Sequence, residues 1–246
     1  RKETLLDLCR FSTNENDDIM SLSSYLEKMP ENQKDIYYIS AETRSQALAS
    51  PHLEGFKSKN IPVLIMTDAI DQFWLPMIGS FKDKKFTSIT QGQINLDDLD
   101  EKNKDKKSDS KDQKEKQDKE FVDLIAQMKV VLGEQVKDIR LSSKLTDSPV
   151  CLVADDGDMD IAMEQLMAQR DTNYKGAPRI LEINGDHSLI KNMKSLLSKK
   201  ENNDLVSDAG TLLFEQARLL EGKMPADPAQ FSKIINQFLL KAIPTQ

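Results

Sequence analysis

Residues Gly133–Arg170 read GEQVKDIRLSSKLTDSPVCLVADDGDMDIAMEQLMAQR, and this stretch decides the fold of the second half of the chain. Apolar and polar residues mix over Val136–Leu141, a pattern typical of a half-buried strand. The short apolar run Val150–Ala154, bounded by turn signals, is typical of a more deeply buried strand. Asp158 is then placed to cap a helix that begins at Met159. The stretch therefore predicts strand, turn, strand and helix.

The predicted helix carries an apolar stripe with the spacing i, i+4, i+7 and i+8, which puts its members on one face. Such a stripe usually packs into a core. The alternative is an adaptable exposed surface, because methionine is unbranched and polarizable and can repack against different partners. The four residues of the stripe are Met159, Met163, Leu166 and Met167.

Composition bounds the classes of protein that this chain can represent. Its 246 residues are 38% hydrophobic and 30% charged, enough for one large domain or two modest ones. The net charge of −7 argues against general nucleic-acid binding, which requires a basic face. No apolar run approaches the roughly 20 residues of a membrane-spanning helix, and the first residues do not form a secretory signal. We therefore expect a cytoplasmic protein that binds neither nucleic acid nor membrane.

The two cysteines and the start of the chain give two further expectations. Cys9 and Cys151 lie far apart and fit no metal-ligand spacing, which predicts two buried, reduced thiols. Arg1 stands where an initiator methionine would be, and a helical pattern follows it without a capping residue. We therefore expect a fragment of a longer protein.

The first part of the chain alternates helical patterns with short apolar runs. Ser21 is placed to cap a helix that runs through Met29. Ile36–Ile39 and Val63–Met66 are predicted strands, and the helical patterns between them make a βαβ unit with a parallel pair. Phe86–Ile89 predicts one more strand. Tyr37 and Tyr38 alternate along the first of these strands, so one is expected to face the core and the other the surface.

No catalytic arrangement stands out in the sequence. It has no glycine-rich phosphate loop, no nucleophile elbow and no histidine pair, and His52 is best explained as structural or solvated. Asp155, Asp156 and Asp158 suggest a calcium loop, but the spacing and the closing glutamate of such loops are missing, so helix capping is the better account. We expect no catalytic residue, no metal site and no cofactor in this chain, and an enzyme is the weakest interpretation.

The most biased stretch is Asp97–Glu120, in which acidic and basic residues are interleaved. Nothing in it can drive burial, yet it lacks proline and glycine and is rich in good helix formers. We expect its second half to be an exposed helix that runs into the apolar stripe of Phe121–Leu132, and its first half to be loose. The predicted organisation is a small α/β domain over 1–96, a charged linker and helix over 97–120, and a second domain over 121–246.

Two local patterns follow the predicted helix that carries Met159, Met163, Leu166 and Met167, named here the methionine helix. Ile180–Ile183 is a short apolar run that predicts a strand or extended segment. Asn184–Gly185 is a turn signal, and Asp186 is placed to cap a helix over His187–Leu197.

Two predicted helices close the chain. The first covers Asp204–Glu221, and the second begins at Pro228 with Asp227 as its cap. They form a helical hairpin, because their connection is short. The second one is apolar over more than one face, so its hairpin partner cannot cover it. Leaving several large apolar side chains in water would cost on the order of the whole stability of a domain. A second copy of the chain would bury them, and the alternative is that both helices pack inward. The residues predicted at the dimer interface are Leu212, Leu213, Leu219, Leu220, Ile234, Ile235, Phe238 and Leu239.

Several long blocks in the chain resemble the ninety-kilodalton heat-shock chaperones, in their bacterial form. Three blocks resemble the carboxy-terminal domain of that family: VKDIRLSSKLTDSPVCLV, the methionine helix and LEINGDHSLI. Four earlier blocks resemble the end of its middle domain: LLDLCRFST, MSLSSYLEKMPENQKDIYYIS, SPHLEGFKSKNIPVLIMTDAIDQFW and KFTSI. The blocks keep the family's order and cover almost the whole chain.

The resemblance implies a mixed α/β (α+β) fold: a small βαβ-containing middle subdomain followed by a dimerisation domain that ends in a helical hairpin. It implies a homodimer formed through the last two helices. It also implies that the methionine helix is exposed and binds unfolded or partly folded client proteins. An aromatic residue of the family's middle domain adds to client binding, and that position falls on Phe73, with Trp74 one position away.

The resemblance further implies that ATP, magnesium and a catalytic arginine belong to a region upstream of Arg1, so that this chain alone hydrolyses no ATP. The chain ends in Ile243–Gln246 without the acidic tail of eukaryotic cytosolic members, and helical-repeat co-chaperones are therefore not expected. The residues themselves leave one alternative open. It is a dimeric scaffold that binds one defined partner and whose methionine helix is ordinary core.

Overall fold

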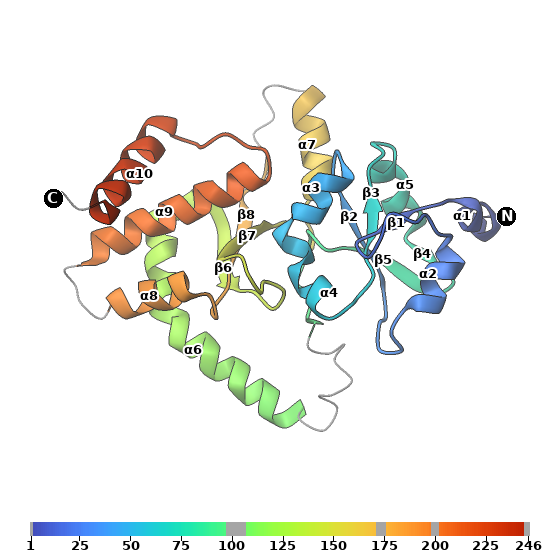
Figure 1. Cartoon of the computed structure of the whole chain (residues 1–246), viewed down its shortest axis with the longest axis horizontal. Coiled ribbons are helices and arrows are strands. Elements are labelled where there is room, and N and C mark those ends of the chain that lie inside the picture. Colours follow the sequence, from blue (N-terminus) through green and yellow to red (C-terminus); the bar gives the residue numbers. More distant parts are fainter. Residues whose placement is uncertain (1, 97–106, 171–175, 198–201, 244–246) are drawn as a thin grey trace. The chain divides into compact units, whose positions relative to one another are not determined.

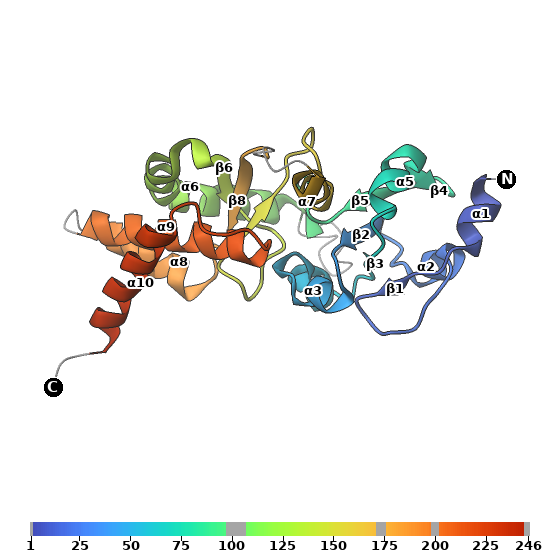
Figure 2. The same cartoon turned by 90° about the horizontal axis from the view of Figure 1, so that it is seen from above.

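The computed structural model has a mixed α/β fold with two small sheets (Figures 1 and 2). It describes residues 2–96, 107–170, 176–197 and 202–243. The chain divides into two compact units, and neither is continuous in sequence. The first unit comprises residues 1–109, 143–147 and 153–177, and the second comprises 110–142, 148–152 and 178–246.

These units divide the chain differently from the predicted 1–96, 97–120 and 121–246. The segment that carries the methionine helix was assigned to the second domain, but it packs within the first unit. Two stretches from beyond the charged linker therefore help to build the first unit.

The first unit contains a five-stranded sheet in the order β1-β3-β2-β5-β4. The central strand β2 pairs in parallel with β3 and with β5, so that Tyr38 lies opposite Leu64 on one side and Ser88 on the other. The predicted parallel pair is confirmed. The outer strands β1 and β4 pair antiparallel with β3 and β5. The bounds are β1 Ser12–Thr13, β2 Ile36–Ser40, β3 Leu64–Met66, β4 Ser80–Phe81 and β5 Lys84–Ser88.

Helices cover both faces of this sheet. One apolar cluster packs α1, α2 and α5 against β2 and β3, and a second cluster packs α3 and α4 against their other face. The predicted cap at Ser21 is confirmed, because its side chain accepts a hydrogen bond from the backbone N–H of Ser24. The bounds are α1 Lys2–Leu8, α2 Leu22–Lys28, α3 Arg44–Ala49, α4 Glu54–Ser58, α5 Asp71–Ile78 and α7 Ile161–Arg170, with a 3-10 turn over Pro51–Leu53.

The two adjacent tyrosines of β2 are both buried, so the expectation that one would face the surface is wrong. Tyr38 joins the first cluster, whereas Tyr37 joins the second, where its ring lies 5.1 Å from that of Phe56. Burial raises the pKa of Tyr37 to about 12. Alternation along the strand holds, but both faces of the sheet are covered.

The second unit contains a three-stranded sheet in the order β6-β8-β7. Strand β8 pairs in parallel with β6, with Ile139 opposite Leu181. The two strands of Gly133–Arg170 are therefore present, but they are not neighbours, because β8 lies between them. The bounds are β6 Val136–Leu141, β7 Val150–Val153 and β8 Arg179–Ile183.

In the described part of the second unit there are four α-helices: α6 Lys107–Leu132, α8 Ser188–Leu197, α9 Asn203–Leu220 and α10 Pro228–Ala242. The first three residues of α6 are counted with the first unit. A 3-10 turn over Gly133–Gln135 follows α6. Helix α6 confirms that the second half of the charged stretch is helical, whereas most of its first half lies outside the described residues. Asp227 caps α10 as predicted, since its carboxylate accepts from Ala229 and Gln230 N–H at 3.0 and 2.9 Å. The predicted cap at Asp186 is wrong: His187 Nδ1 accepts from the backbone of Leu189, and Asp186 pairs with Lys191.

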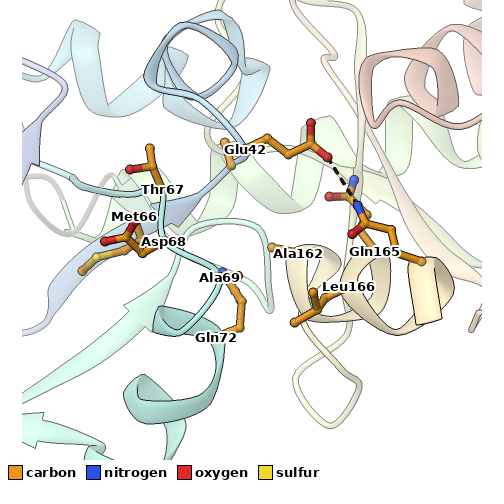
Figure 3. Close-up of a pocket in the computed structure, with 11 residues that line it drawn as sticks. Glu42, Met66, Thr67, Asp68, Ala69, Gln72, Ala162, Gln165 and Leu166 are labelled. Carbon is orange, nitrogen blue, oxygen red and sulfur yellow. Dashed lines mark hydrogen bonds between the residues drawn. The ribbon is translucent and has the colours of Figure 1, made fainter.

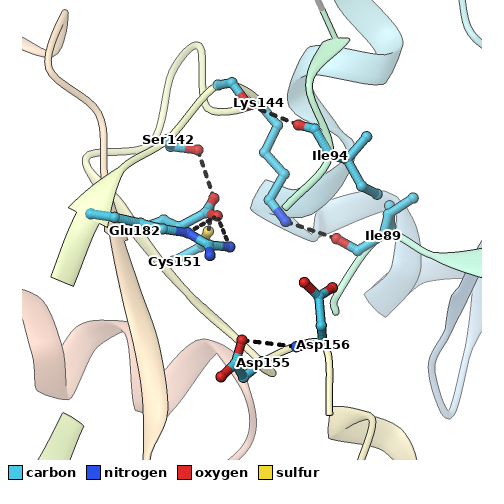
Figure 4. A network of polar contacts seen from close by, with 10 residues as sticks. Ile89, Ile94, Ser142, Lys144, Cys151, Asp155, Asp156 and Glu182 are labelled. Atoms are coloured by element: carbon cyan, nitrogen blue, oxygen red, sulfur yellow. Dashed lines mark hydrogen bonds and ion pairs between the residues drawn. The ribbon is translucent and has the colours of Figure 1, made fainter. Parts of the chain in front are cut away.

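An ion pair between half-buried Arg140 and buried Glu182 joins β6 to β8 in this unit. The Arg140 guanidinium donates to Glu182 Oε1 from Nε and Nη2 at 3.0 and 2.8 Å, and the Ser142 hydroxyl donates to Oε2 at 2.8 Å. Figure 4 shows Glu182 beside Ser142 and the thiol of Cys151. Cys151 is buried as predicted, but Cys9 is exposed, so the expectation of two buried thiols is half wrong.

Candidate functional site

Helix α7 begins at Ile161, two residues later than predicted. Asp160 is its cap: its Oδ1 accepts from the Ala162 N–H at 2.9 Å and its carbonyl accepts from the Glu164 N–H at 2.9 Å. The prediction that Asp158 caps a helix starting at Met159 is therefore wrong. The Gln91 side-chain amide donates to the carbonyl of Asp158 at 2.7 Å and holds this residue in the preceding turn.

The second oxygen of Asp160 ties α7 to the end of β5. Its Oδ2 accepts hydrogen bonds from the hydroxyls of Ser88 at 2.5 Å and Thr90 at 2.9 Å, and both of these residues are buried. Hydrogen bonds to a charged group contribute about 1.5–3 kcal/mol each. The start of α7 is thus anchored by polar contacts rather than by its methionines.

The methionine stripe lies outside the core. Met159 precedes the helix and is 39% exposed, whereas Met163, Leu166 and Met167 are half-buried. None of the four belongs to the apolar core clusters of the described residues. Helix α7 buries Ile161 and Glu164 instead. This placement favours a surface role for the stripe over a core role.

One flank of α7 forms the wall of a pocket of about 140 Å³ within the first unit (Figure 3). Three segments line it: α7, the residues that follow β2, and the stretch from the end of β3 into α5. Leu166 and Ala162 face Ala69 and Gln72 across the opening. The lining residues are Ala41, Glu42, Met66, Thr67, Asp68, Ala69, Gln72, Ala162, Gln165, Leu166 and Gln169.

The charge at this pocket is of one sign. Glu42 and Asp68 are exposed and carry its carboxylates, and the described residues of the lining include no lysine, arginine or histidine. Gln169 Nε2 approaches Glu42 Oε1 at 3.4 Å, which is a weak hydrogen bond. The pocket is therefore an apolar hollow with acidic groups at its edge.

The two neighbouring aromatic residues of α5 have different environments. Trp74 packs against the core, with its ring 6.2 Å from that of Phe11 and 6.0 Å from that of Phe86. Its Nε1–H donates to Asp71 Oδ1 at 2.7 Å. Phe73 is half-buried and belongs to none of the clusters in the described part of the chain. Phe73 is thus the more available ring, and it adjoins Gln72, which lines the pocket.

The predicted interface residues of α9 and α10 fall into three groups. Leu213 and Ile234 are buried within the second unit, and Phe238 packs against its core. Leu212 and Ile235 are half-buried, whereas Leu219, Leu220 and Leu239 are exposed. Three apolar residues outside this predicted set are more exposed still: Met224 at 71%, Leu240 at 76% and Ile243 at 69%. The run Phe238-Leu239-Leu240 was the available signal, because three successive residues of a helix cannot all face one core.

Comparison with known proteins gives the family. A family model described as Hsp90 protein matches residues 1–246. The chain belongs to the Hsp90 family. A relative named chaperone protein HtpG, from Roseobacter denitrificans, is 40% identical over 244 residues, which cover 98% of this chain and 39% of the relative.

Two other relatives with the name chaperone protein HtpG show the same extent. The one from Mycobacterium avium is 37% identical over 243 residues, with 98% of this chain and 37% of the relative covered. The one from Wolbachia pipientis wMel is 36% identical over 242 residues, again with 98% and 37% covered. The chain thus spans about two fifths of the length of these Hsp90 relatives.

The pocket beside α7 does not suit the nucleotide that the Hsp90 resemblance associates with a longer chain. A pocket of about 140 Å³ edged by Glu42 and Asp68 would repel a triphosphate. Among the described residues no group of three or more histidine, cysteine, aspartate or glutamate side chains has the arrangement of a metal site. No step of the function proposed below therefore runs through ATP. The described helices include none that is long and apolar enough to cross a membrane.

Proposed function

We propose that this chain is the end of the middle domain and the carboxy-terminal dimerisation domain of a bacterial Hsp90-family chaperone. In this role it joins two protomers and presents apolar surface to unfolded or partly folded client proteins. The observation that carries the proposal is the apolar flank of α7, which lies outside the core and beside a pocket.

The client surface would comprise Met159, Met163, Leu166 and Met167, with Phe73 and Trp74 from α5. Its chemistry is apolar burial without any covalent step. Methionine side chains adapt to differently shaped partners, and burial of apolar surface contributes roughly 25 cal/mol per Å². A half-exposed set of flexible side chains is suited to weak binding of many sequences rather than tight binding of one.

The dimer would form through the exposed apolar residues of α9 and α10. Leu219, Leu220 and Leu239 belong to the interface predicted from the sequence, and Leu240 and Ile243 extend it. Burial of four or five such side chains against a second copy would contribute several kcal/mol. We further propose a cytoplasmic protein whose ATPase region lies in the part of the Hsp90 relatives that this chain does not cover.

Binding of unrelated unfolded chains tests the client surface. Three reduced and alkylated proteins of different sequence, each labelled with a fluorophore, are titrated with the chain and followed by anisotropy. We expect micromolar binding to all three, and at least ten-fold weaker binding when Met163, Leu166 and Met167 are changed to glutamine. Val130→Gln is the matched control, because Val130 is 80% exposed on α6.

The competing hypothesis is a dimeric scaffold that binds one defined partner. It predicts that none of the three unfolded proteins binds, or that the triple glutamine variant binds as the unchanged chain does. Either result would contradict the chaperone proposal.

Sedimentation equilibrium tests the dimer. We expect the unchanged chain to sediment as a dimer at micromolar concentration and a Leu220→Glu, Leu240→Glu variant to sediment as a monomer. Val122→Glu with Val130→Glu, which adds the same two negative charges at exposed apolar sites of α6, should remain dimeric. Leu213 is unsuited to this test, because a charge at that buried position would unfold the second unit. If the unchanged chain sediments as a monomer, the dimer proposal is wrong.

A further inference from the structure

The pocket beside α7 has the volume of a single side chain. A cavity of about 150 Å³ in another protein holds one benzene molecule, and this pocket measures about 140 Å³. Met66, Ala69, Ala162 and Leu166 contribute aliphatic surface to its walls. One leucine or phenylalanine side chain would fill it, whereas a strand or helix would not enter.

The carboxylates at the edge of the pocket favour a ligand that carries positive charge. Glu42 follows β2 and Asp68 follows β3, so the two carboxylates come from different loops. The nearest cation in sequence, Arg44, is engaged elsewhere. Its guanidinium pairs with Asp17 at 2.7 Å and donates to the carbonyls of Thr13 and Asn16 at 3.0 and 2.7 Å. Among the described residues no ion pair joins a lysine or arginine to Glu42 or Asp68, so a cationic ligand would meet their negative charge.

We propose that this pocket binds one aliphatic or aromatic side chain of a client segment in which a lysine or arginine stands next to that residue. The apolar side chain enters between α7 and the loop before α5, and the neighbouring cation meets the carboxylates of Glu42 and Asp68. The inference rests on the client-binding function proposed above and adds a sequence preference to it.

Charge complementarity selects this occupant over others. A segment with a net negative charge would be repelled by the two carboxylates. A phosphate or nucleotide would meet two carboxylates. A cationic unfolded segment gains from both the apolar wall and the acidic edge. Exposed ion pairs contribute about 0.2–1 kcal/mol each, so two of them correspond to a preference of about ten-fold.

Three labelled, unstructured peptides test the proposal. Each has the same glycine- and serine-rich frame and differs only at its centre, which is Lys-Leu-Lys, Glu-Leu-Glu or Lys-Ser-Lys. Anisotropy at low ionic strength gives the affinity of the whole 246-residue chain for each peptide. We expect Lys-Leu-Lys to bind about ten-fold more tightly than Glu-Leu-Glu. Lys-Ser-Lys should bind more weakly than Lys-Leu-Lys, because its serine cannot fill the apolar pocket.

The decisive variant is Glu42→Gln with Asp68→Asn, in which the ratio between the first two peptides should fall to about two or less. Asp123→Asn with Asp204→Asn is the matched control, because it removes the same charge from exposed positions of the second unit and should leave the ratio unchanged. Glu42→Lys with Asp68→Lys provides an independent variant: it reverses the charge at the pocket edge and should favour Glu-Leu-Glu.

Two results would overturn the inference: an unchanged ratio in the Glu42→Gln, Asp68→Asn variant, or equal loss of the ratio in the control. These outcomes differ from failure of the proposed function. If the chain is no chaperone, no peptide and no unfolded protein binds at all. If only the inference fails, all three unfolded proteins still bind but the flanking charge has no effect through Glu42 and Asp68.

Discussion

The hydroxyl of Ser88 donates a hydrogen bond to Oδ2 of Asp160 at 2.5 Å, across 72 positions of sequence. Together with Thr90, it holds the first residue before α7 against the end of β5. This contact fixes the start of the helix that carries most of the proposed client surface.

Asp160→Ala should therefore loosen α7 without touching its apolar residues. The change removes two charge-assisted hydrogen bonds and a helix cap, which lowers the local opening free energy by about 2 kcal/mol or more. Hydrogen exchange in residues 161–170, followed by mass spectrometry, should become about 30-fold faster. Asp156→Ala, an exposed carboxylate of the same loop, is the control and should exchange as the unchanged chain does.

The two aromatic residues of α5 should separate binding from stability. Trp74→Ala removes a ring that packs on Phe11 and Phe86, and should lower the free energy of unfolding of the first unit by about 2–3 kcal/mol. Phe73→Ala should change that stability by less than about 1 kcal/mol yet weaken client binding. Urea denaturation and anisotropy measure the two effects. Equal effects of both changes on stability would contradict the placement of Phe73.

The pH dependence of stability should report on Asp71. Burial raises the pKa of Asp71 above its ordinary value, and the nearby carboxylate of Asp68 adds to the rise, against the opposing hydrogen bond from Trp74. A carboxyl whose pKa is raised on folding contributes stability that is fully present below its unfolded pKa of about 3.9 and is lost as the pH rises through the folded pKa.

Asp71→Asn removes this titration while keeping an acceptor for the Trp74 N–H. The difference in unfolding free energy between the variant and the unchanged chain should therefore shift in favour of the variant as the pH rises from 4 to 7. Urea denaturation at several pH values measures it. A difference that stays constant over this range would show that the Asp71 pKa is not raised by folding.

The two thiols should react at very different rates. Cys9 is exposed, whereas Cys151 is 1% exposed beside Glu182. An aromatic disulfide reagent should modify one thiol per native chain quickly and the second only after denaturation. Cys9→Ser should abolish the fast phase. Two fast thiols in the unchanged chain would mean that the sheet of the second unit opens readily.

Core and interface leucines of α9 should also behave differently. Leu213→Ala should lower the free energy of unfolding by about 2–5 kcal/mol at every protein concentration, because Leu213 is buried within the protomer. Leu220→Ala should alter stability only in a concentration-dependent way, through the proposed dimer. Urea midpoints over a 100-fold range of concentration distinguish them. A concentration-independent loss in Leu220→Ala would place that residue in the protomer core.

Local patterns predicted most individual elements correctly. The apolar run from Val150, the caps at Ser21 and Asp227, and the parallel pair of β2 and β3 all follow from short-range signals. These signals depend on residues a few positions apart, and the structure preserves them.

The errors arise where a distant segment decides between local candidates. Asp158 and Asp160 are both suitable caps, and the choice falls to Asp160 because Gln91 binds the carbonyl of Asp158. Tyr37 and Tyr38 are both buried because helices from two parts of the chain cover the sheet. Strand β8 takes the place between β6 and β7, which no spacing within Gly133–Arg170 indicates.

The candidate site shows the same division. The helical spacing of the sequence indicated Met163, Leu166 and Met167, and the family resemblance indicated Phe73. The pocket itself was not, because Glu42 and Asp68 stand more than 90 positions from α7 and carry no motif. Only the fold brings them together.

The first unit draws its strands from one part of the chain and α7 from another, and this arrangement has a consequence for genetic dissection. Two separately expressed polypeptides, 1–96 and 107–246, would each hold an incomplete half of that unit: Ser88, Thr90 and Gln91 on one, and Ala154, Asp158 and Asp160 on the other. When expressed together they should reassemble by fragment complementation. A deletion series that cuts at the charged stretch would therefore assign α7 to the second unit, although it packs within the first.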